Sequence, residues 1–436
     1  MKFSKMFYVV ISIILVTIFM LIIYIFPSYN ISDRSIGKPI KIYFADNISS
    51  AHRKLIGLFN EKYKGQIEVV PIDLPFSKFS TNDRKELLAR YFRSKSDRID
   101  VFSVDQIWVP RFARWAIPLE EYFSKPEKDS LLSYALKTCY YNDTLVAVPL
   151  YIDVALMYYR KDIIDKLSDA KAIENELSNS ITWQQLINLN KKIKNNPLYV
   201  FQADDYEGLI CSYIEILANM GGKFMEDDSL LFKSPKAIEA LQYLDDLFKK
   251  DKISPQEVLR FKEDDSYKYF FQDNSVFVRG WTGLFKNNAV GKKYFNLKDD
   301  VEAVPTPHLE GSKPASVFGG WDLMISRFST KIPAAVKFVK FLTSKEAQKI
   351  LFEGGGFIPT NNELFDDSAY VQKHPNLKFY SKLLKNGIYR PFSEHYTKVS
   401  DILSYYINLS LKSDITPRDA LYRAYDKLNS KNILLK

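Results

Sequence analysis

The residues best suited to chemistry in this sequence are aromatic side chains that stand close to polar ones. Four such pairs occur where a strand is expected to end or a turn to begin: Asp105 with Trp108, Tyr151 with Asp153, Arg279 with Trp281, and Trp321 with Asp322. A flat aromatic ring offers a large apolar face at a small cost in side-chain entropy, and a fixed polar neighbour can bind hydroxyl groups. We therefore interpret the pairs as suited to holding a ring-shaped ligand that has C–H faces and hydroxyl edges.

Each tryptophan of these pairs, taken alone, could equally pack in a core, but their matched positions as a set favour ligand contact. Arg279 could instead pair with a buried carboxylate. Gly319 and Gly320 precede Trp321 and would let the backbone approach a ligand closely. Arg390 could reach the same place from a later segment. Packing is the expected role of the remaining tryptophans, Trp115 and Trp183.

Signatures of enzymatic chemistry are missing from the sequence. It contains no G-x-x-x-x-G-K-[ST] loop, no G-x-S-x-G and no H-E-x-x-H. The carboxylate pairs Asp204-Asp205 and Asp264-Asp265 fall in expected polar loops, where solvated charge is the simpler interpretation. Two carboxylates opposed across a cleft, as glycoside hydrolysis needs, are not excluded by the sequence.

Metal and nucleic-acid binding are not indicated, and no cofactor is expected. The chain of 436 residues has 4 His and 2 Cys, and Cys139 and Cys211 show no metal-ligand spacing. Its formal net charge is +9, but Lys and Arg are interleaved with Asp and Glu along the whole chain. No nucleic-acid-binding motif accompanies them, so we expect solvated basic faces rather than a nucleic-acid partner.

The expected strands bring the candidate residues to particular edges. Residues 40–45, 50–63 and 66–72 read as strand, helix and strand, which implies a parallel sheet. Ile99 to Val104 reads as a buried strand, and Asp105 follows at its carboxyl end. Ligands gather at this edge of open α/β sheets.

The stretch from 316 to 361 has the clearest local pattern. Asp322 to Ser326 reads as a strand, and Pro333 fits the first turn of a helix. Apolar residues then recur at i, i+3, i+4 and i+7 on one helix face, namely Ala335, Phe338, Val339 and Leu342. Thr343 and Glu346 match a capping box that would open a second helix. That helix should end at the three glycines 354–356.

The N-terminal segment predicts a membrane anchor. Met6 to Phe26 is a nearly unbroken apolar run after Lys2 and Lys5. Its length suits the ~20 residues of a spanning helix and exceeds the ~7–15 residues of a signal-peptide core. No cleavage-like site follows Phe26, and no Cys precedes Cys139. We expect an uncleaved single-pass anchor with the globular part extracytoplasmic; a cleaved signal peptide is the alternative.

Longer stretches carry a family resemblance. In chain order they read DVFSVDQIWVPRFARWAIPLEEY, TLVAVPLYIDVALMYY, TWQQL, SVFVRGW, the Gly-Gly-Trp turn with AAVKFVKFLTSKEAQ, and TPRDAL. Their order and spacing resemble the extracellular solute-binding proteins of ABC importers, in the sugar-binding, maltose-binding-protein-like branch. The resemblance covers most of the chain.

The resemblance implies an α/β, two-lobed periplasmic-binding-protein-like fold of class II with a ligand cleft between the lobes. The strand-end Asp, the tryptophans and the Gly-Gly-Trp turn would line this cleft. Crossovers between the lobes are expected near Pro149, Pro305 and Gly356. The expected division is 1–38 for anchor and tether, 39–150 and 304–356 for lobe 1, and 151–303 and 357–436 for lobe 2.

The resemblance also implies a function without catalysis. A monomer would close about its hinge on a sugar or oligosaccharide and deliver it to membrane permease subunits. Two alternatives stay open: an extracytoplasmic carbohydrate-active enzyme, and a ligand-sensing subunit for a membrane kinase. Cys139 and Cys211 would lie in different lobes, where a disulfide would lock the hinge, so we expect free thiols.

Overall fold

The computed structural model describes residues 38–75, 78–193, 198–226, 229–273 and 275–430. The expected anchor, Met6 to Phe26, lies outside these residues. Within the described part of the chain, no helix has both the length and the apolar composition needed to cross a membrane.

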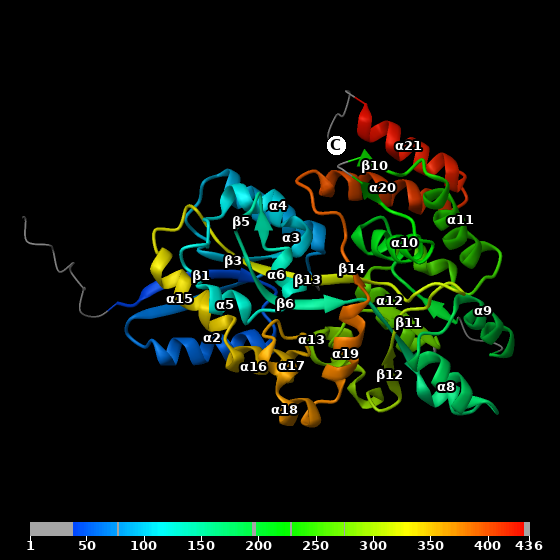
Figure 1. Cartoon of the computed structure of the whole chain (residues 1–436), viewed down its shortest axis with the longest axis horizontal. Coiled ribbons are helices and arrows are strands. Elements are labelled where there is room, and N and C mark those ends of the chain that lie inside the picture. The colour runs from blue at the N-terminus through cyan, green and yellow to red at the C-terminus, as the bar shows by residue number, and fades with distance from the viewer. Residues whose placement is uncertain (1–37, 76–77, 194–197, 227–228, 274, 431–436) are drawn as a thin grey trace, which may run out of the picture.

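A mixed sheet forms the centre of the first lobe (Figure 1). Its strands lie in the order β14-β13-β3-β1-β2, and β6 also pairs with β13. The bounds are β1 Ile40–Asp46, β2 Ile67–Asp73, β3 Val101–Asp105, β6 Val148–Val154, β13 Ser316–Ile325 and β14 Gly387–Ile388. β1 is parallel to β2 and β3, as the βαβ order predicts. β13 runs antiparallel to both β3 and β6, so this one strand connects them within the sheet.

A second, smaller sheet forms the centre of the other lobe. Its order is β12-β7-β11-β8, where β7 is antiparallel to both neighbours and β11 is parallel to β8. The bounds are β7 Leu156–Arg160, β8 Tyr199–Val200, β11 Phe277–Gly280 and β12 Val301–Val304. Two short antiparallel pairs lie outside these sheets in the described part of the chain. They are β4 Tyr140–Tyr141 with β5 Thr144–Leu145, and β9 Met225–Glu226 with β10 Ser229–Leu230.

The chain passes repeatedly between the two sheets. β6 ends at Val154 and β7 begins at Leu156, so Ala155 alone separates a strand of one sheet from a strand of the other. The chain returns from β12 to β13 through residues 305–315. Each sheet is therefore assembled from separated segments, and the sheets are joined close to β6 and β13. This is a two-lobed α/β fold.

Helices cover both sides of the first sheet. Figure 1 shows α3 and α4 on one side and α2, α15 and α16 on the other. The bounds are α2 Ser50–Lys62, α3 Thr81–Arg93, α4 Val109–Phe112, α15 Ile332–Leu342 and α16 Lys345–Gly355. Shorter elements of this region are η1 Gln106–Trp108, η2 Ala113–Trp115, α5 Lys125–Asp129 and α6 Ser133–Lys137.

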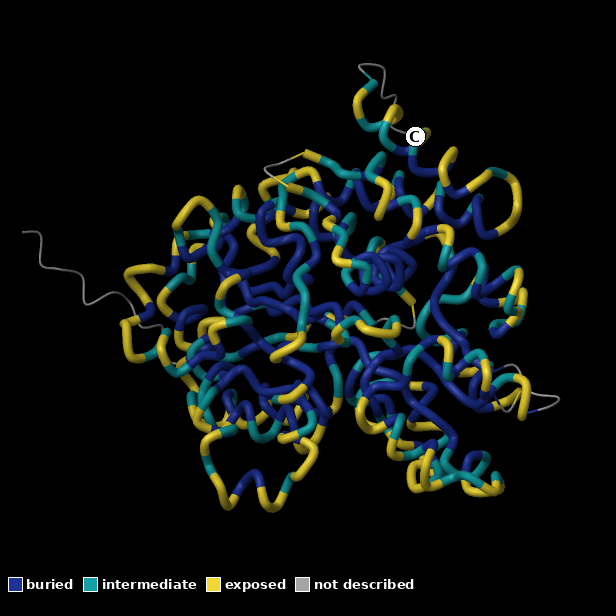
Figure 2. The backbone as a smooth tube through the Cα atoms, turned by 45° about the vertical axis from the view of Figure 1, so that its right-hand side comes forward, coloured by how far each residue is buried: buried dark blue, intermediate teal, exposed yellow. Residues whose placement is uncertain are grey.

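The helices between β7 and β12 surround the second sheet. They are α7 Lys161–Ile164, α8 Ala170–Ser178, α9 Trp183–Lys192, α10 Glu207–Asn219, α11 Pro235–Lys249, η3 Gln256–Arg260, α12 Glu263–Gln272, α13 Leu284–Asn287, α14 Ala289–Lys293 and η4 Phe295–Leu297. Buried backbone runs through the interior of both lobes, and exposed residues lie mainly on outer loops and helix surfaces (Figure 2).

The C-terminal segment, expected as part of lobe 2, contacts both lobes. Its elements are α17 Glu363–Asp366, α18 Ser368–Lys373, α19 Asn376–Lys385, α20 Tyr396–Leu411 and α21 Pro417–Asn429. α19 packs against β6 and β13, and β14 pairs with β13. α20 and α21 pack instead against α10 and α11. The segment between β14 and α20 therefore leads from one lobe to the other.

The local pattern from 316 to 361 was predicted correctly for the two helices, but the strand and one helix cap differ. The strand expected at Asp322 to Ser326 is β13, Ser316–Ile325, so the expected Gly-Gly-Trp turn lies inside a strand. The stripe Ala335, Phe338, Val339 and Leu342 is fully buried. The expected stop is confirmed at Gly356, which has φ +70°. The N-cap of α16, however, is Ser344, whose Oγ accepts the Ala347 N–H, and not Thr343. The Thr343 hydroxyl donates back to carbonyls of α15 and ends that helix instead.

Candidate functional site

A cavity of about 620 Å³ is lined by residues of both lobes. This volume lies in the range of small-molecule sites. The first lobe contributes the loop after β1, the end of β3, and parts of β6 and β13. The second lobe contributes the starts of α10 and α12 and the chain after β11. The predicted residues that line the cavity are Asp105, Tyr151, Asp153, Trp281, Gly319, Gly320, Trp321 and Arg390.

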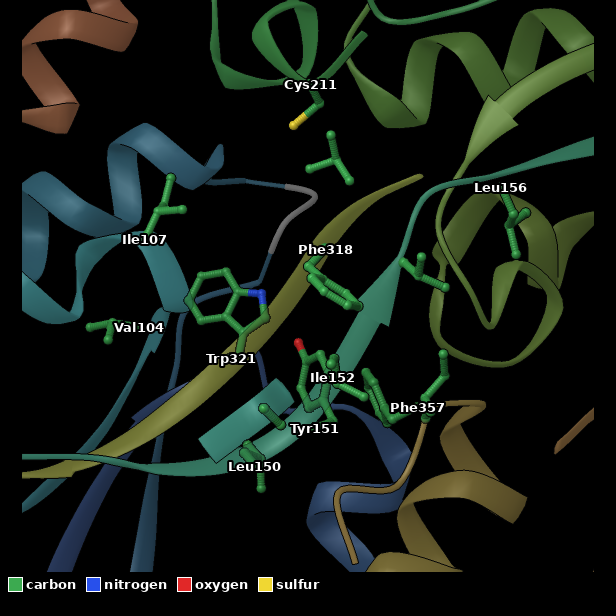
Figure 3. Close-up of a cluster of buried hydrophobic side chains, with 14 of the residues drawn as sticks. Val104, Ile107, Leu150, Tyr151, Ile152, Leu156, Cys211, Phe318, Trp321 and Phe357 are labelled. Atoms are coloured by element: carbon green, nitrogen blue, oxygen red, sulfur yellow. The ribbon is translucent and has the colours of Figure 1, made fainter. Parts of the chain in front are cut away.

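The floor on the first lobe is aromatic. Trp321 and Tyr151 are register partners on the neighbouring strands β13 and β6. Figure 3 shows their rings on these strands, with Phe357 next to Tyr151. The centroids of the Tyr151 and Phe357 rings are 4.4 Å apart. Gly320 allows the backbone of β13 to lie close to that of β6, because its φ is +138° and an added Cβ would meet the Tyr151 carbonyl oxygen at 2.7 Å.

Trp108 differs from the prediction. Its side chain is 2% exposed and is not part of the cavity lining. It lies behind Trp321, with ring centroids 6.2 Å apart and planes at 88°. The cause is the turn after β3, where Asp105 Oδ1 accepts the Ile107 N–H and starts η1. This turn directs Trp108 into the core.

Arg279 and Asp322 also lie outside the cavity lining. Arg279 is fully buried and donates to both carboxylate oxygens of Glu215, at 2.9 and 2.8 Å, which is the alternative that the sequence left open. Asp322 is 2% exposed, and burial raises its pKa to about 8. Adjacent residues of a strand point to opposite faces, so only one of Trp321 and Asp322 can face the cavity.

Asp153 connects the lobes at the cavity. Its Oδ1 accepts hydrogen bonds from the Thr282 backbone N–H at 3.1 Å and from the Thr282 hydroxyl at 2.8 Å. Asp153 belongs to β6 of the first sheet, and Thr282 follows β11 of the second. Burial raises the pKa of Asp153 to about 6. The site therefore contains a carboxyl group that titrates in the mildly acidic range.

Arg390 makes a second, charged connection between the lobes. Its Nη2 donates to Asp105 Oδ1 at 2.7 Å, and its Nη1 donates to Glu207 Oε1 at 2.9 Å. Burial opposes the charge of Arg390, yet Asp105 and Glu207 hold its pKa well above the usual value. Burial raises the pKa of Glu207, and Arg390 opposes that rise. The end of β3 and the start of α10 are thus joined by one guanidinium group.

Sequence reasoning missed most of the second-lobe lining. The missed residues include Tyr206, Glu207, Lys262, Glu263, Asp264, Asp265, Tyr267, Thr282 and Asn288. The sequence favours solvated loop charge for Asp264-Asp265, but both residues belong to the first turn of α12, which lines the cavity. Glu263 is half-buried there, and desolvation raises its pKa. An acidic run at a helix start is common on surfaces, so no sequence signal distinguished it.

Cys139 and Cys211 are both buried and free, as expected. Burial raises the pKa of Cys211 to about 12, so this thiol is a poor nucleophile although it lines the cavity. Within the described ranges, no group of three or more His, Cys, Asp or Glu side chains is placed to hold a metal ion.

The fold and the interlobe cavity are those of a binding protein, and comparison with known proteins identifies the family. The bacterial extracellular solute-binding protein family matches residues 43–349. The chain belongs to this family, so the resemblance expected from the sequence is confirmed.

Individual relatives are similar over most of their length. The chain is 26% identical over 352 residues to the probable ABC transporter-binding protein of Deinococcus radiodurans, covering 78% of this chain and 81% of the relative. It resembles the structure of maltose-bound T. maritima MalE3 with a TM-score of 0.78 and 29% identity, covering 89% and 99% of the two chains. A Thermotoga lettingae solute-binding protein bound to alpha-D-tagatose gives a TM-score of 0.76 at 24% identity, over 90% and 99% of the chains.

Proposed function

We propose that this protein is the sugar-binding component of an ABC importer and acts outside the cytoplasm. The observation that carries the proposal is the meeting of Trp281 and Trp321, from opposite lobes, at one cavity that also holds carboxylates. Aromatic faces suit the C–H faces of a sugar ring, and carboxylates accept its hydroxyl hydrogens. The tagatose- and maltose-bound neighbours and the transporter-associated relative support this choice.

The mechanism follows from the position of these groups relative to the crossovers. A ligand that packs on Trp321 and Tyr151 contacts only lobe 1 in the open form. It contacts Trp281 of lobe 2 when the lobes close. Contacts made only when the lobes meet bind the closed form more tightly, and this shifts the population toward closure. Ala155 follows Asp153 by two residues at the crossover from β6 to β7, so a rotation there changes the distance between the lobes. No covalent step is required.

The proposal extends to the membrane. Met6 to Phe26 would hold the globular part at the outer face of the cell membrane, where the closed monomer docks on permease subunits. The lobe boundaries 39–150, 151–303, 304–356 and 357–436 belong to the same proposal with two changes. The first boundary moves to Ala155, because β6 pairs with β13, and β14 is counted with lobe 1 for the same reason. A tethered binding protein stays near its permease, because the linker raises its effective concentration there.

A thermal-shift screen tests the proposed function directly. The detergent-solubilised full chain is heated with neutral mono- and oligosaccharides, and with amino acids and polyamines as other solute classes. A ligand that binds only the native state at 100 times its Kd stabilises it by about 2.7 kcal/mol. We expect a shift with at least one sugar and its loss in Trp281→Ala.

Other outcomes would change the assignment. Stabilisation by amino acids or polyamines alone would contradict the sugar ligand. Release of shortened sugars during incubation would indicate a carbohydrate-active enzyme. A third outcome would indicate a sensor. In that case the protein binds a sugar, but a strain in which its gene is deleted still imports the sugar and loses a kinase response.

A further inference from the structure

A buried arginine lies directly behind the aromatic floor of the cavity. Arg84, on α3, is 0% exposed and is not among the lining residues. Its guanidinium carbon is 3.8 Å from the centroid of the Trp321 ring. At this distance the planar guanidinium covers one face of the indole. A ligand in the cavity can therefore meet Trp321 only at its other face or at an edge.

The arginine is itself held in place by an ion pair with a buried aspartate. Its Nη2 donates to Asp46 Oδ1 at 2.8 Å, and Asp46 is 1% exposed at the end of β1. The Ser103 hydroxyl of β3 donates to the same oxygen. His52 lies 3.7 Å from Asp46 Oδ2, and burial lowers the His52 pKa, so this ring is neutral at pH 7. Arg84 is thus the charged partner of Asp46.

We propose that Arg84 is a positioning residue for the sugar site, which fixes the plane of Trp321 by stacking on the face turned away from the ligand. The inference rests on the proposed function. The ion pair with Asp46 fixes the position of the guanidinium group. The Trp108 ring packs against Trp321 with the ring planes at 88°, which restricts rotation of the Trp321 indole. The ring is then held in one orientation before a ligand arrives, so binding need not order it.

A double-mutant cycle separates positioning from a general structural role. The variants are Arg84→Met, Arg84→Lys, Trp321→Phe and Arg84→Met combined with Trp321→Phe. The first readout is the near-ultraviolet circular dichroism spectrum without ligand. The difference between the spectra of wild type and Trp321→Phe defines the signal of the fixed Trp321 indole. The second readout is the Kd for maltose, the sugar bound in a similar structure.

If Arg84 positions Trp321, Arg84→Met abolishes the Trp321 signal and weakens maltose binding by about tenfold. Arg84→Lys, which keeps the charge without the planar group, retains part of both. In the Trp321→Phe background, Arg84→Met has no further effect on either readout. A Trp321 signal that persists in Arg84→Met, or equal loss of affinity in both backgrounds, would overturn the proposal.

Two further variants keep the test decisive. Arg53 also pairs with an aspartate, at 2.7 Å from Asp73, but its side chain is 58% exposed; Arg53→Met should change neither readout. If Arg84→Met alone does not fold, Arg84→Met with Asp46→Leu removes both charges of the buried pair and is better tolerated. The spectral readout needs no ligand. Failure of wild type to bind maltose would count against maltose as the ligand, while the spectrum still decides the role of Arg84.

Discussion

Gly319 of β13 lies directly against the indole of Trp281, which belongs to the other lobe. A Cβ added to Gly319 would stand 2.8 Å from Trp281 Cζ3 and 3.2 Å from Asp153 Cβ. The missing side chain therefore makes room for the ring that closes over the cavity. The fit of one lobe on the other depends on a single glycine at this point.

Gly319→Ala should weaken sugar binding more than it lowers stability. The added methyl group displaces Trp281, which is only half-buried and can move outward without opening the core. We expect at least about a tenfold higher Kd by calorimetry, on the scale of a binding hot spot, with a small change in Tm. Gly57→Ala is the control, since an added Cβ in α2 has no neighbour within 4 Å. Unchanged affinity in Gly319→Ala would show that Trp281 does not need its observed position.

Trp281→Ala and Trp321→Ala should separate affinity from stability. Trp321 is 7% exposed and packs on Arg84 and Trp108. Its loss should reduce the free energy of unfolding by roughly 3–5 kcal/mol as well as weaken binding. Trp281→Ala should weaken binding by about 2 kcal/mol or more with a smaller effect on folding. Urea unfolding and calorimetry measure both. Early melting with normal binding in both variants would make the two rings core residues only.

Arg390→Met should destabilise the protein strongly. It leaves Asp105 and Glu207 buried without their shared cation, and breaking such pairs costs roughly 3–5 kcal/mol. Burial already raises the pKa of Glu207, so removing Arg390 should raise it further. The stability deficit should therefore shrink as the pH falls and Glu207 takes up a proton. Unfolding in urea at pH 5 and pH 7 checks this. An equal deficit at both pH values would exclude the charge explanation, and Arg390→Met with Glu207→Gln should recover part of the loss.

Asp153→Asn should remove a pH dependence of stability. The pKa of Asp153 is raised from 3.8 to about 6 in the folded protein. Between these values the unfolded chain has released a proton that the folded chain keeps, so stability falls as pH rises through this window. The free energy of unfolding, measured from pH 4 to pH 7, should fall less steeply in Asp153→Asn than in wild type. Parallel profiles would contradict the raised pKa.

The same carboxyl should make binding pH-dependent. An ionised Asp153 is the better acceptor for a ligand hydroxyl, so the affinity for a bound sugar should decrease as the pH falls below about 6. Calorimetric titrations of wild type at pH 5 and pH 7.5 test this. Asp153→Asn is the control, and its Kd should be the same at both pH values. A Kd that is equal at both pH values in wild type would place the ligand away from Asp153.

The mature protein should retain Met6 to Phe26. The apolar run is long enough to span a bilayer, and Phe26-Pro27-Ser28-Tyr29 is a poor cleavage site. Intact-mass measurement and N-terminal sequencing of the purified membrane fraction check this. A mature N-terminus between Pro27 and Lys41 would contradict the anchor.

The sequence predicted features whose causes are local. The apolar stripe of α15, the glycine stop at Gly356 and the buried strand before Asp105 each depend on residues within one or two turns or strands. The family resemblance added the two-lobed fold, because it combines many such local patterns in their order along the chain. Two local errors occurred in this stretch. Thr343 instead of Ser344 at the cap of α16 arose between adjacent hydroxyl residues that can each bind a backbone group. The turn expected at Gly319 to Trp321, where β13 continues, arose because glycine is a common turn residue.

Tertiary contacts alone decided which candidates reach the cavity. Arg279 could have faced a ligand, but Glu215, 64 residues earlier in the chain, takes its guanidinium group. The sequence favoured ligand contact equally for Trp108 and Trp321. The turn after β3 places Trp108 in the core, where it packs against Trp321. The arginine that stacks on Trp321 lies on α3, where no pattern marked it. Side-chain partners across a fold are chosen by shape and charge in three dimensions, and the spacing along the chain does not record them.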